Sequence, residues 1–236
     1  MTTATAVSLV YEYDGGLYVN LTSRCPTACA FCIKFSWDYK YRGHDLKLPT
    51  EPTVDEILSA APPDLSKYRE VVFCGYGEST YRLAEMKTLA AAFRARGARR
   101  IRLNTVGLGN LINGRNIAPE LTFLDAVSIS LNTVDPDTYL KIMRPRPEFR
   151  DRALASVKEF IVECARAVPN TTVTAVALPG VDPAGVENVA RAAGARYRLR
   201  PHLDAYEEEA ILPSIGDDPR PPGGSPGPRT SRRHRR

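Results

Sequence analysis

Residues 17–32 read LYVNLTSRCPTACAFC, an apolar segment that leads directly into three closely spaced cysteines. The content of Leu, Val and Thr in Leu17–Thr22 predicts a strand. In α/β folds, sites form in the loops beyond the carboxyl ends of parallel strands. A strand followed at once by three reactive side chains therefore predicts an α/β fold with its chemistry at that edge.

The rest of the chain repeats a strand-then-helix pattern. Five more segments rich in Val, Ile, Leu and Thr predict strands, at residues 70–74, 100–105, 126–131, 171–178 and 196–200. Helical patterns alternate with them, at residues 53–61, 81–96, 150–168 and 183–193. The alternation predicts a parallel sheet, built either as an open doubly wound sheet or as an incomplete (β/α)6 TIM-like barrel.

We expect one core domain at residues 9–203 of the 236-residue chain. Residues 204–236 begin acidic and continue with six prolines, a Gly-Gly pair and a terminal cluster of arginines. Such a composition buries too little apolar surface to offset the entropy of ordering. A disordered tail is therefore predicted.

The net charge of +5 is concentrated at the end of the chain, where six arginines and two aspartates follow Pro213. Because the remainder is nearly neutral, we expect no dedicated nucleic-acid surface, only a weak contact by the arginine-rich end. No apolar run is long enough to span a bilayer, and residues 1–8 lack the pattern of a secretory signal. We therefore expect a cytoplasmic protein that does not contact a membrane.

The three cysteines have the spacing C-x3-C-x2-C, with Cys25, Cys29 and Cys32 on one loop. A ferredoxin-type [4Fe–4S] cluster takes four thiolates, and the next cysteine, Cys74, is more than forty residues away. One iron would lack a protein ligand, and an open coordination position is typical of a metal site that binds substrate or cofactor. Cys74 and Cys164 lie in apolar patterns, which predicts buried structural thiols.

A zinc site is the main alternative for this loop. Soft thiolates suit zinc as well as iron–sulfur clusters, and His44 follows Cys32 by twelve residues. Structural zinc ligands usually come as two close pairs, whereas this loop carries an isolated triplet. The spacing therefore favours an iron–sulfur cluster over a Cys3His zinc site.

The cysteine loop resembles that of the radical S-adenosylmethionine (SAM) enzymes, including the aromatic Phe31 just before the last cysteine. A second motif agrees, since Gly75-Tyr76-Gly77-Glu78 is similar to the family's Gly-Gly-Glu segment, with Tyr76 in place of one glycine. In the family this edge binds the amino group of methionine. The resemblance implies that the glycines admit backbone carbonyls and that Glu78 favours an ammonium.

Two further strand ends carry weaker similarities. Asn104-Thr105-Val106-Gly107 is similar to a segment of radical activases whose threonine helps hold the methionine carboxylate, which implies that role for Thr105. Ser128, Ser130 and Asn132 alternate with Val127, Ile129 and Leu131, so a polar row faces one side of a strand and an apolar row the other. The family places contacts with the ribose of SAM at this strand end, and the resemblance implies that Ser130 and Asn132 make these contacts.

A closer resemblance is to the small radical SAM proteins associated with TatD-type hydrolases. It rests on residues 20–25, 107–114 and 178–182, within a stretch from Leu17 to His202. It implies an incomplete (β/α)6 barrel with one [4Fe–4S] cluster and SAM bound to its open iron. It also implies an electron donor of the flavodoxin or ferredoxin type and a TatD-type hydrolase as a partner.

The leading functional hypothesis is therefore a radical SAM enzyme that reductively cleaves SAM and acts on an unidentified small molecule or peptide. The alternative is a non-catalytic iron–sulfur redox or iron sensor, which would bind a cluster without depending on SAM. No catalytic side chain is assigned. Candidate gate or anion-binding groups, or simply members of a solvated surface, are Tyr39, Tyr41, Arg42, His44, Arg144 and Arg146.

Overall fold

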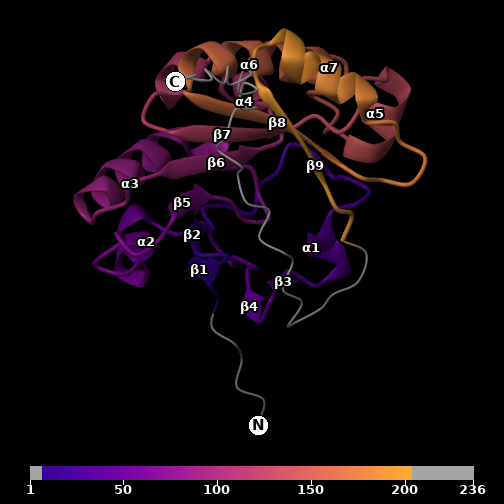
Figure 1. Cartoon of the computed structure of the whole chain (residues 1–236). Coiled ribbons are helices and arrows are strands. Elements are labelled where there is room, and N and C mark those ends of the chain that lie inside the picture. The colour runs from indigo at the N-terminus through magenta and orange to yellow at the C-terminus, as the bar shows by residue number, and fades with distance from the viewer. Residues whose placement is uncertain (1–6, 204–236) are drawn as a thin grey trace, which may run out of the picture.

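The structure, a computed structural model, describes residues 7–203 (Figure 1). The segment predicted to be a disordered tail, residues 204–236, lies outside the described residues. No helix among the described residues is long and apolar enough to cross a membrane.

One seven-stranded sheet organises the described chain. Its strands lie in the order β1 (Val10–Tyr13), β2 (Gly16–Val19), β5 (Glu70–Phe73), β6 (Ile101–Thr105), β7 (Ala126–Ser130), β8 (Asn170–Val176) and β9 (Arg196–Arg200). All neighbours pair in parallel except β1 and β2, which form an antiparallel hairpin. The six parallel strands are the six predicted ones, and the α/β class is confirmed.

The strand order separates the two predicted architectures. Spatial order follows chain order from β2 to β9, so the crossovers run in one direction, and the order reversal that defines a doubly wound sheet is absent from residues 7–203. Within that range no pairing joins β1 to β9, so the sheet remains an incomplete barrel. The hairpin strand β1 was not predicted from the sequence.

Helices cover the outer side of this curved sheet. Figure 1 shows α3 (Leu83–Ala95), α6 (Ala153–Ala167) and α7 (Ala184–Ala192) along that side. On the opposite side lie α1 (Ile33–Ser36) and the hairpin of β3 (Lys40–Tyr41) and β4 (His44–Asp45). The remaining elements are α2 (Val54–Ala60), α4 (Gly109–Asn113), α5 (Pro136–Met143) and two short 3₁₀ helices, η1 (Ser79–Arg82) and η2 (Ala118–Leu121).

Helix α2 starts at the predicted residue for a specific reason. The Glu56 backbone N–H donates to the Thr53 hydroxyl at 3.2 Å, and the Thr53 N–H donates to the Glu56 carboxylate at 2.7 Å. This reciprocal capping box satisfies two N–H groups that a helix start leaves without partners.

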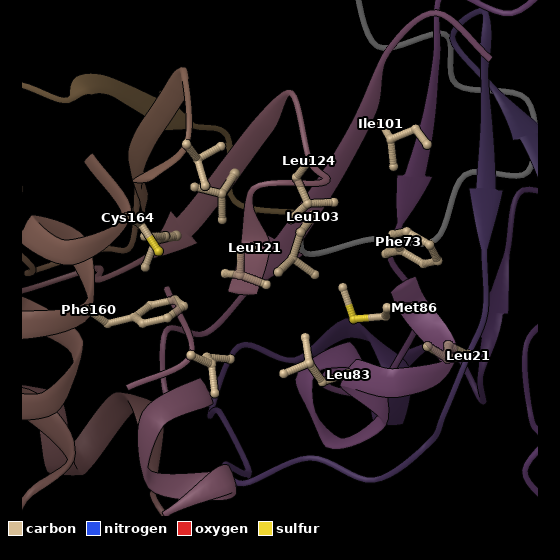
Figure 2. Packing of buried hydrophobic residues seen from close by; sticks show 14 of the residues in the cluster. Leu21, Phe73, Leu83, Met86, Ile101, Leu103, Leu121, Leu124, Phe160 and Cys164 are labelled. Atoms are coloured by element: carbon tan, nitrogen blue, oxygen red, sulfur yellow. The ribbon is translucent and has the colours of Figure 1, made fainter. Parts of the chain in front are cut away.

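The apolar core lies between the sheet and the outer helices. Val127, Ile129 and Leu131, the predicted apolar row, are fully buried in it. Figure 2 shows Leu103, Leu121, Leu124 and Phe160 in the same apolar layer, with Cys164 at its α6 side. Cys164 has no exposed surface, which confirms the predicted structural thiol.

Candidate functional site

The cysteine loop leaves the carboxyl end of β2, and its three thiols lie close together. The Thr27 hydroxyl is 3.4 Å from the Cys25 sulfur and 3.3 Å from the Cys29 sulfur. The Cys32 backbone N–H donates to the Cys29 carbonyl at 3.0 Å, and Cys32 is the N-cap of α1. The loop therefore presents three partly buried thiols, two of which contact the Thr27 hydroxyl.

Burial sets the protonation state of these thiols. Desolvation raises the pKa of Cys29 to about 12 against the lowering effect of Thr27, and it also raises the pKa of Cys25. Both groups are therefore neutral thiols at pH 7 in the free protein. A bound metal centre supplies the positive charge that deprotonates coordinating thiols, so metal loading would release protons here.

The segment after α5 holds this loop from one side. The Ala28 N–H donates to the Arg144 carbonyl at 3.0 Å, and the Arg146 N–H donates to the Pro26 carbonyl at 2.9 Å. The Arg146 Nε donates to the Cys25 carbonyl at 2.9 Å. Two of the candidate gate residues thus fix the backbone of the cysteine loop.

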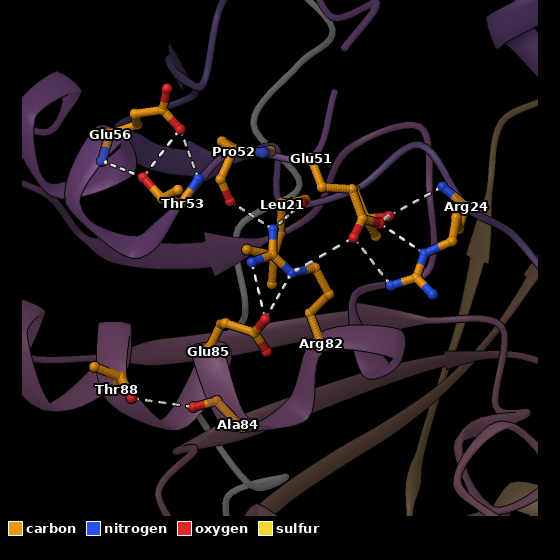
Figure 3. Close-up of polar contacts among 11 residues, drawn as sticks. Leu21, Arg24, Glu51, Pro52, Thr53, Glu56, Arg82, Ala84, Glu85 and Thr88 are labelled. Atoms are coloured by element: carbon orange, nitrogen blue, oxygen red, sulfur yellow. Dashed lines mark hydrogen bonds and ion pairs between the residues drawn. The ribbon is translucent and has the colours of Figure 1, made fainter. Parts of the chain in front are cut away.

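A buried arginine holds the loop from the other side, as Figure 3 shows. Arg82 donates from Nη1 to the Leu21 carbonyl at 3.2 Å and to the Pro52 carbonyl at 2.6 Å, while Nε and Nη2 reach Glu85. Glu51 continues the network by accepting from the Arg24 guanidinium at 2.6 Å and 3.1 Å. The end of β2, the segment before α2 and the start of α3 are thereby joined.

The second motif, Gly75–Glu78, lies directly against the first. A Cβ on Gly75 would be 2.4 Å from the Asn20 Oδ1, and a Cβ on Gly77 would be 2.1 Å from the Thr22 carbonyl oxygen. The Glu78 N–H donates to the Arg24 carbonyl at 2.7 Å. Glycine is required here because the two loops approach each other more closely than any side chain permits.

Glu78 is 1% exposed, and its carboxylate is surrounded by donors of its own chain. Oε1 accepts from the Thr80 N–H at 3.2 Å, and Oε2 accepts from the Val106 N–H at 2.8 Å. The hydroxyls of Thr80 and Thr105 add further hydrogen bonds. Glu78 thus ties the loop after β5 to the end of β6, and its contact with a methionine ammonium stays a prediction.

The other predicted SAM contacts lie along the same edge. Tyr76 donates to the Lys40 carbonyl at 2.6 Å, and Phe31 packs partly buried against the core. The Ser130 hydroxyl is 3.3 Å from both Thr174 Oγ1 and Arg200 Nη2. Asn132 is fully buried, with Nδ2 at 3.1 Å from the Met143 sulfur and Oδ1 accepting from the Val176 N–H. The Met143 sulfur is also 4.0 Å from the Cys29 sulfur, so Asn132 lies near the cysteine loop, and the ribose contacts of Ser130 and Asn132 stay predictions.

A cavity of about 590 Å³ opens on the inner face of the sheet beside these loops. Cys74, Gly75 and Tyr76 line it near the motifs, and Ser128 represents the predicted polar row of β7. The expectation that Cys74 is a buried core thiol is wrong. Residues alternate between faces along a strand, and Cys74 follows Phe73, whose side chain fills the core, so Cys74 faces the cavity.

The donor set fits an iron–sulfur cluster better than a single metal ion. Among residues 7–203, no three His, Cys, Asp or Glu side chains are grouped closely enough to hold one ion. His44 does not join the cysteines, since its Nδ1 is 3.3 Å from the Ser8 hydroxyl and its ring packs 5.4 Å from that of Tyr11. A cluster takes each thiolate on a different iron, which the neighbouring but separate thiols of this loop suit.

The arginines that line this cavity were not predicted as site residues from the sequence. Arg100 and Arg102 come from β6 and the residue before it, and Arg196, Arg198 and Arg200 come from β9. Their spacing of two residues was the available signal, because it places each set on one face of a strand. The segment Arg196–Arg200, with the sequence RYRLR, predicts a strand through its apolar residues, and its three arginines form a row of charges on one face of that strand.

A family model and a curated protein both match most of this chain in sequence. The family model described as Radical SAM superfamily matches residues 19–193. A curated GTP 3′,8-cyclase of Corynebacterium glutamicum (strain R) is 29% identical over 178 residues, which is 70% of this chain and 42% of that protein. The chain therefore spans less than half the length of this curated relative.

Solved structures share the fold at low sequence identity. TYW1 with a lysine-pyruvate adduct bound has a TM-score of 0.56 at 14% identity, covering 84% of this chain and 68% of that one. Streptococcus suis SuiB bound to the precursor peptide SuiA has a TM-score of 0.57 at 14% identity, covering 82% of this chain and 40% of that one. These similarities concern the fold alone.

Proposed function

Because the chain belongs to the radical SAM superfamily, we propose that it reductively cleaves S-adenosylmethionine at a [4Fe–4S] cluster and acts on a small-molecule or peptide substrate. Members of this family are enzymes that use these two cofactors. The observation that carries the proposal is the cysteine loop itself. Three thiols lie at the carboxyl edge of a parallel sheet, against a glycine loop and beside a cavity.

Cys25, Cys29 and Cys32 would hold the cluster and leave one of its irons open to SAM. Once reduced, the bound cluster would supply the single electron for cleavage of SAM to methionine and a 5′-deoxyadenosyl radical. The backbone of Gly75–Glu78, with Thr105 and Ser130, lines the edge where SAM would lie. The cavity walls would keep competing hydrogen donors away from the radical.

The partners are part of the proposal as well. A one-electron step requires a donor, and a flavodoxin or ferredoxin is the expected class. The similarity of residues 20–25, 107–114 and 178–182 to TatD-associated radical SAM proteins supports an association with a TatD-type hydrolase in the cytoplasm. Binding of a purified TatD-type hydrolase to the immobilised full chain would support this association, and its absence at micromolar concentrations would contradict it.

Low-temperature EPR of the anaerobically reconstituted, dithionite-reduced protein tests the central proposal. We expect a [4Fe–4S]⁺ signal whose shape changes on addition of SAM, followed by release of 5′-deoxyadenosine. A cluster signal indifferent to SAM would instead identify a sensor. Zinc in place of iron on metal analysis would overturn the proposal.

The cysteine variants assign the ligands. Cys29→Ala should lose both the cluster signal and SAM cleavage, because one iron loses its thiolate. Cys74→Ala is the matched control, since Cys74 lies on the cavity wall outside the loop and should leave the cluster signal in place. A full cluster in Cys29→Ala would contradict the assignment.

A further inference from the structure

The cavity on the inner face of the sheet is lined by an unusual number of cations. Six arginines reach it, at positions 69, 100, 102, 196, 198 and 200, against two carboxylates, Asp14 and Glu70. Barrel interiors are normally packed with apolar side chains, so a charged, open interior calls for a ligand. Because positive charge is in excess, a ligand of this cavity should carry negative charge.

Both carboxylates are already engaged by arginines at the amino ends of the strands. Arg102 holds Glu70 with two hydrogen bonds, at 2.9 Å and 2.7 Å, and Arg100 lies 3.5 Å from the same carboxylate. Arg69 is paired with Asp14 at 2.9 Å. Within residues 7–203, neither carboxylate forms an ion pair with an arginine of β9.

Arg200 is the residue that this arrangement leaves short of partners. It donates from Nη2 to the Ser130 hydroxyl at 3.3 Å, and no ion pair within residues 7–203 joins it to a carboxylate. Its Nε is buried and has no hydrogen-bond partner in that range. Leaving a buried donor on a charged group without a partner is costly, so such a group in a cavity wall is a ligand-binding candidate.

The neighbours of Arg200 make an anion the fitting ligand. Burial, with the positive charges of Arg198 and Arg102, lowers the pKa of Arg200. Ile33, which directly follows Cys32, and Cys74 line the same cavity as Arg200, so the cavity lies beside the cysteine loop. An anion bound here would offset the repulsion among the arginines and would lie near the proposed cluster.

The shape of the cavity narrows the ligand class. Its volume of about 590 Å³ falls within the range of small-molecule sites, roughly 300–1,000 Å³. Tyrosines supply part of the wall, among them Tyr11, Tyr18 and Tyr41, and they offer flat apolar surface beside the charged groups. The site is therefore suited to a compact molecule that has both an anionic group and an apolar or planar body.

We propose that this cavity binds the substrate through a phosphate or carboxylate group that Arg200 holds on the inner face of β9. Guanidinium forks match both groups in planar, two-point hydrogen bonding. The inference rests on the proposed function, since it assigns a substrate class to the same enzyme. The proposed function leaves the substrate as either a small molecule or a peptide. This inference narrows it to a small anionic molecule.

Three sources of the anionic group must be distinguished. The first is an external small molecule, which is the proposal. The second is the carboxylate of SAM itself. The third is the acidic run Glu207–Glu209, which follows the cavity residue Leu203 closely in the sequence.

Calorimetric titration of the full chain with two simple anions tests the site. The protein is cluster-loaded, kept anaerobic without reductant, and saturated with SAM so that the SAM carboxylate is already placed. Inorganic pyrophosphate represents phosphates, and malonate represents carboxylates. We expect at least one of them to bind, and R200Q to weaken that binding about tenfold or more, because charged hydrogen bonds contribute about 1.5–3 kcal/mol.

Matched variants distinguish the loss of the Arg200 charge from a general loss of folded structure. R200K should retain part of the affinity, and R191Q should retain all of it, since Arg191 pairs with Glu187 on the exposed surface of α7. Tighter anion binding in a variant with Glu207–Glu209 changed to Gln would show that these carboxylates compete for the site, and unchanged binding would leave the external anion as its ligand. Both results support an anion site.

The proposal is overturned if neither anion binds wild type more tightly than R200Q. It is also overturned if anions bind only without SAM, because the arginines would then serve the SAM carboxylate. EPR of the same samples keeps the two proposals apart. A SAM-dependent cluster signal without anion binding would remove the substrate class and leave the proposed function in place.

Discussion

At the scale of single residues, Glu78 is a motif residue whose carboxylate forms hydrogen bonds within the protein itself. The resemblance assigns it to the methionine ammonium, whereas the structure gives its oxygens donors from Thr80, Thr105 and Val106. A buried carboxylate with several N–H and O–H donors is a strong cross-link, because each charged hydrogen bond is worth more than a neutral one. The motif glutamate therefore positions two loop ends whatever else it binds.

Glu78→Gln should destabilise the protein although it preserves the shape of the side chain. Each carboxylate oxygen accepts a backbone N–H, so either orientation of the amide turns an NH₂ group toward a donor. We expect a loss of about 1–3 kcal/mol in the free energy of unfolding, measured by urea denaturation. Glu187→Gln on the exposed face of α7 is the control and should change it by only a few tenths. Equal effects of the two variants would contradict the positioning role.

The edge of the sheet at which the candidate site residues gather could be predicted from the sequence, whereas their contacts with a cluster and with SAM stay predictions. The cysteines, the glycine loop, Thr105 and Ser130 were placed at one edge because carboxyl ends of parallel strands meet there, and the structure brings them to that edge. Asn132 is a ribose candidate through the family resemblance, and the structure shows that its backbone is left-handed, with φ of 67°, which ends the regular alternation of the strand. Local backbone geometry of this kind leaves no periodic signal in the sequence.

At the scale of elements, the six parallel strands and helices α2, α3, α6 and α7 were predictable, whereas strand β1 and helices α1, α4 and α5 were not. Strands β5, β6, β7 and β9 lie within one residue of their predicted ranges. The first three contain β-branched and apolar residues in a compact run, and β9 alternates Tyr197 and Leu199 with arginines. The short helices α1 and α4 span fewer than two turns, too few for a 3.6-residue period to show. They form because the loops around them are fixed by tertiary contacts.

The pairing of β5 with β6 adds a charged link that should make stability depend on pH. Burial raises the pKa of Glu70, but the hydrogen bonds and charge of Arg102, aided by Arg100 and Arg69, outweigh it, and the pKa lies below its ordinary value. The pair therefore contributes its full stabilisation above the unfolded-state pKa of about 4.3, and the contribution is lost as the pH falls through the folded-state pKa.

Glu70→Gln tests this link. At pH 7 the variant should lose about 3–5 kcal/mol, because Arg102 is left buried without its carboxylate. The difference from wild type should shrink when both proteins are unfolded by urea at pH 3.5, because this pH lies below the unfolded-state pKa and the unfolded wild-type chain then takes up a proton at Glu70. A difference that stays constant between the two pH values would show that packing, and not ionisation, accounts for the loss.

At the scale of the whole molecule, the spatial order of strands was the part of the fold that periodicity left open. A doubly wound sheet and an incomplete barrel contain the same alternating elements, so only the structure, with strand order following chain order, decides between them. The charged interior could not be predicted from the sequence for a similar reason. Which side of a strand faces a cavity depends on how the sheet curves, and the arginines of β6 and β9 are therefore meaningful only once that curvature is known.

The distribution of charge over the chain leads to a last prediction. The six arginines and two aspartates after Pro213 together carry +4 of the net charge of +5, whereas the arginines of the cavity line its wall. Replacing those six by Gln in the full chain should abolish a weak, low-salt affinity for single-stranded DNA, measured by fluorescence anisotropy. Every phosphate that an arginine neutralises steepens the dependence of log K on log salt by about 0.7, so the wild-type slope should be steeper than that of the variant. R200Q is the control and should bind DNA as wild type does, because a cavity sized for a small anion does not admit a polymer. If the six-arginine variant kept the wild-type affinity in low salt, the arginine-rich end would have no role in binding polyanions.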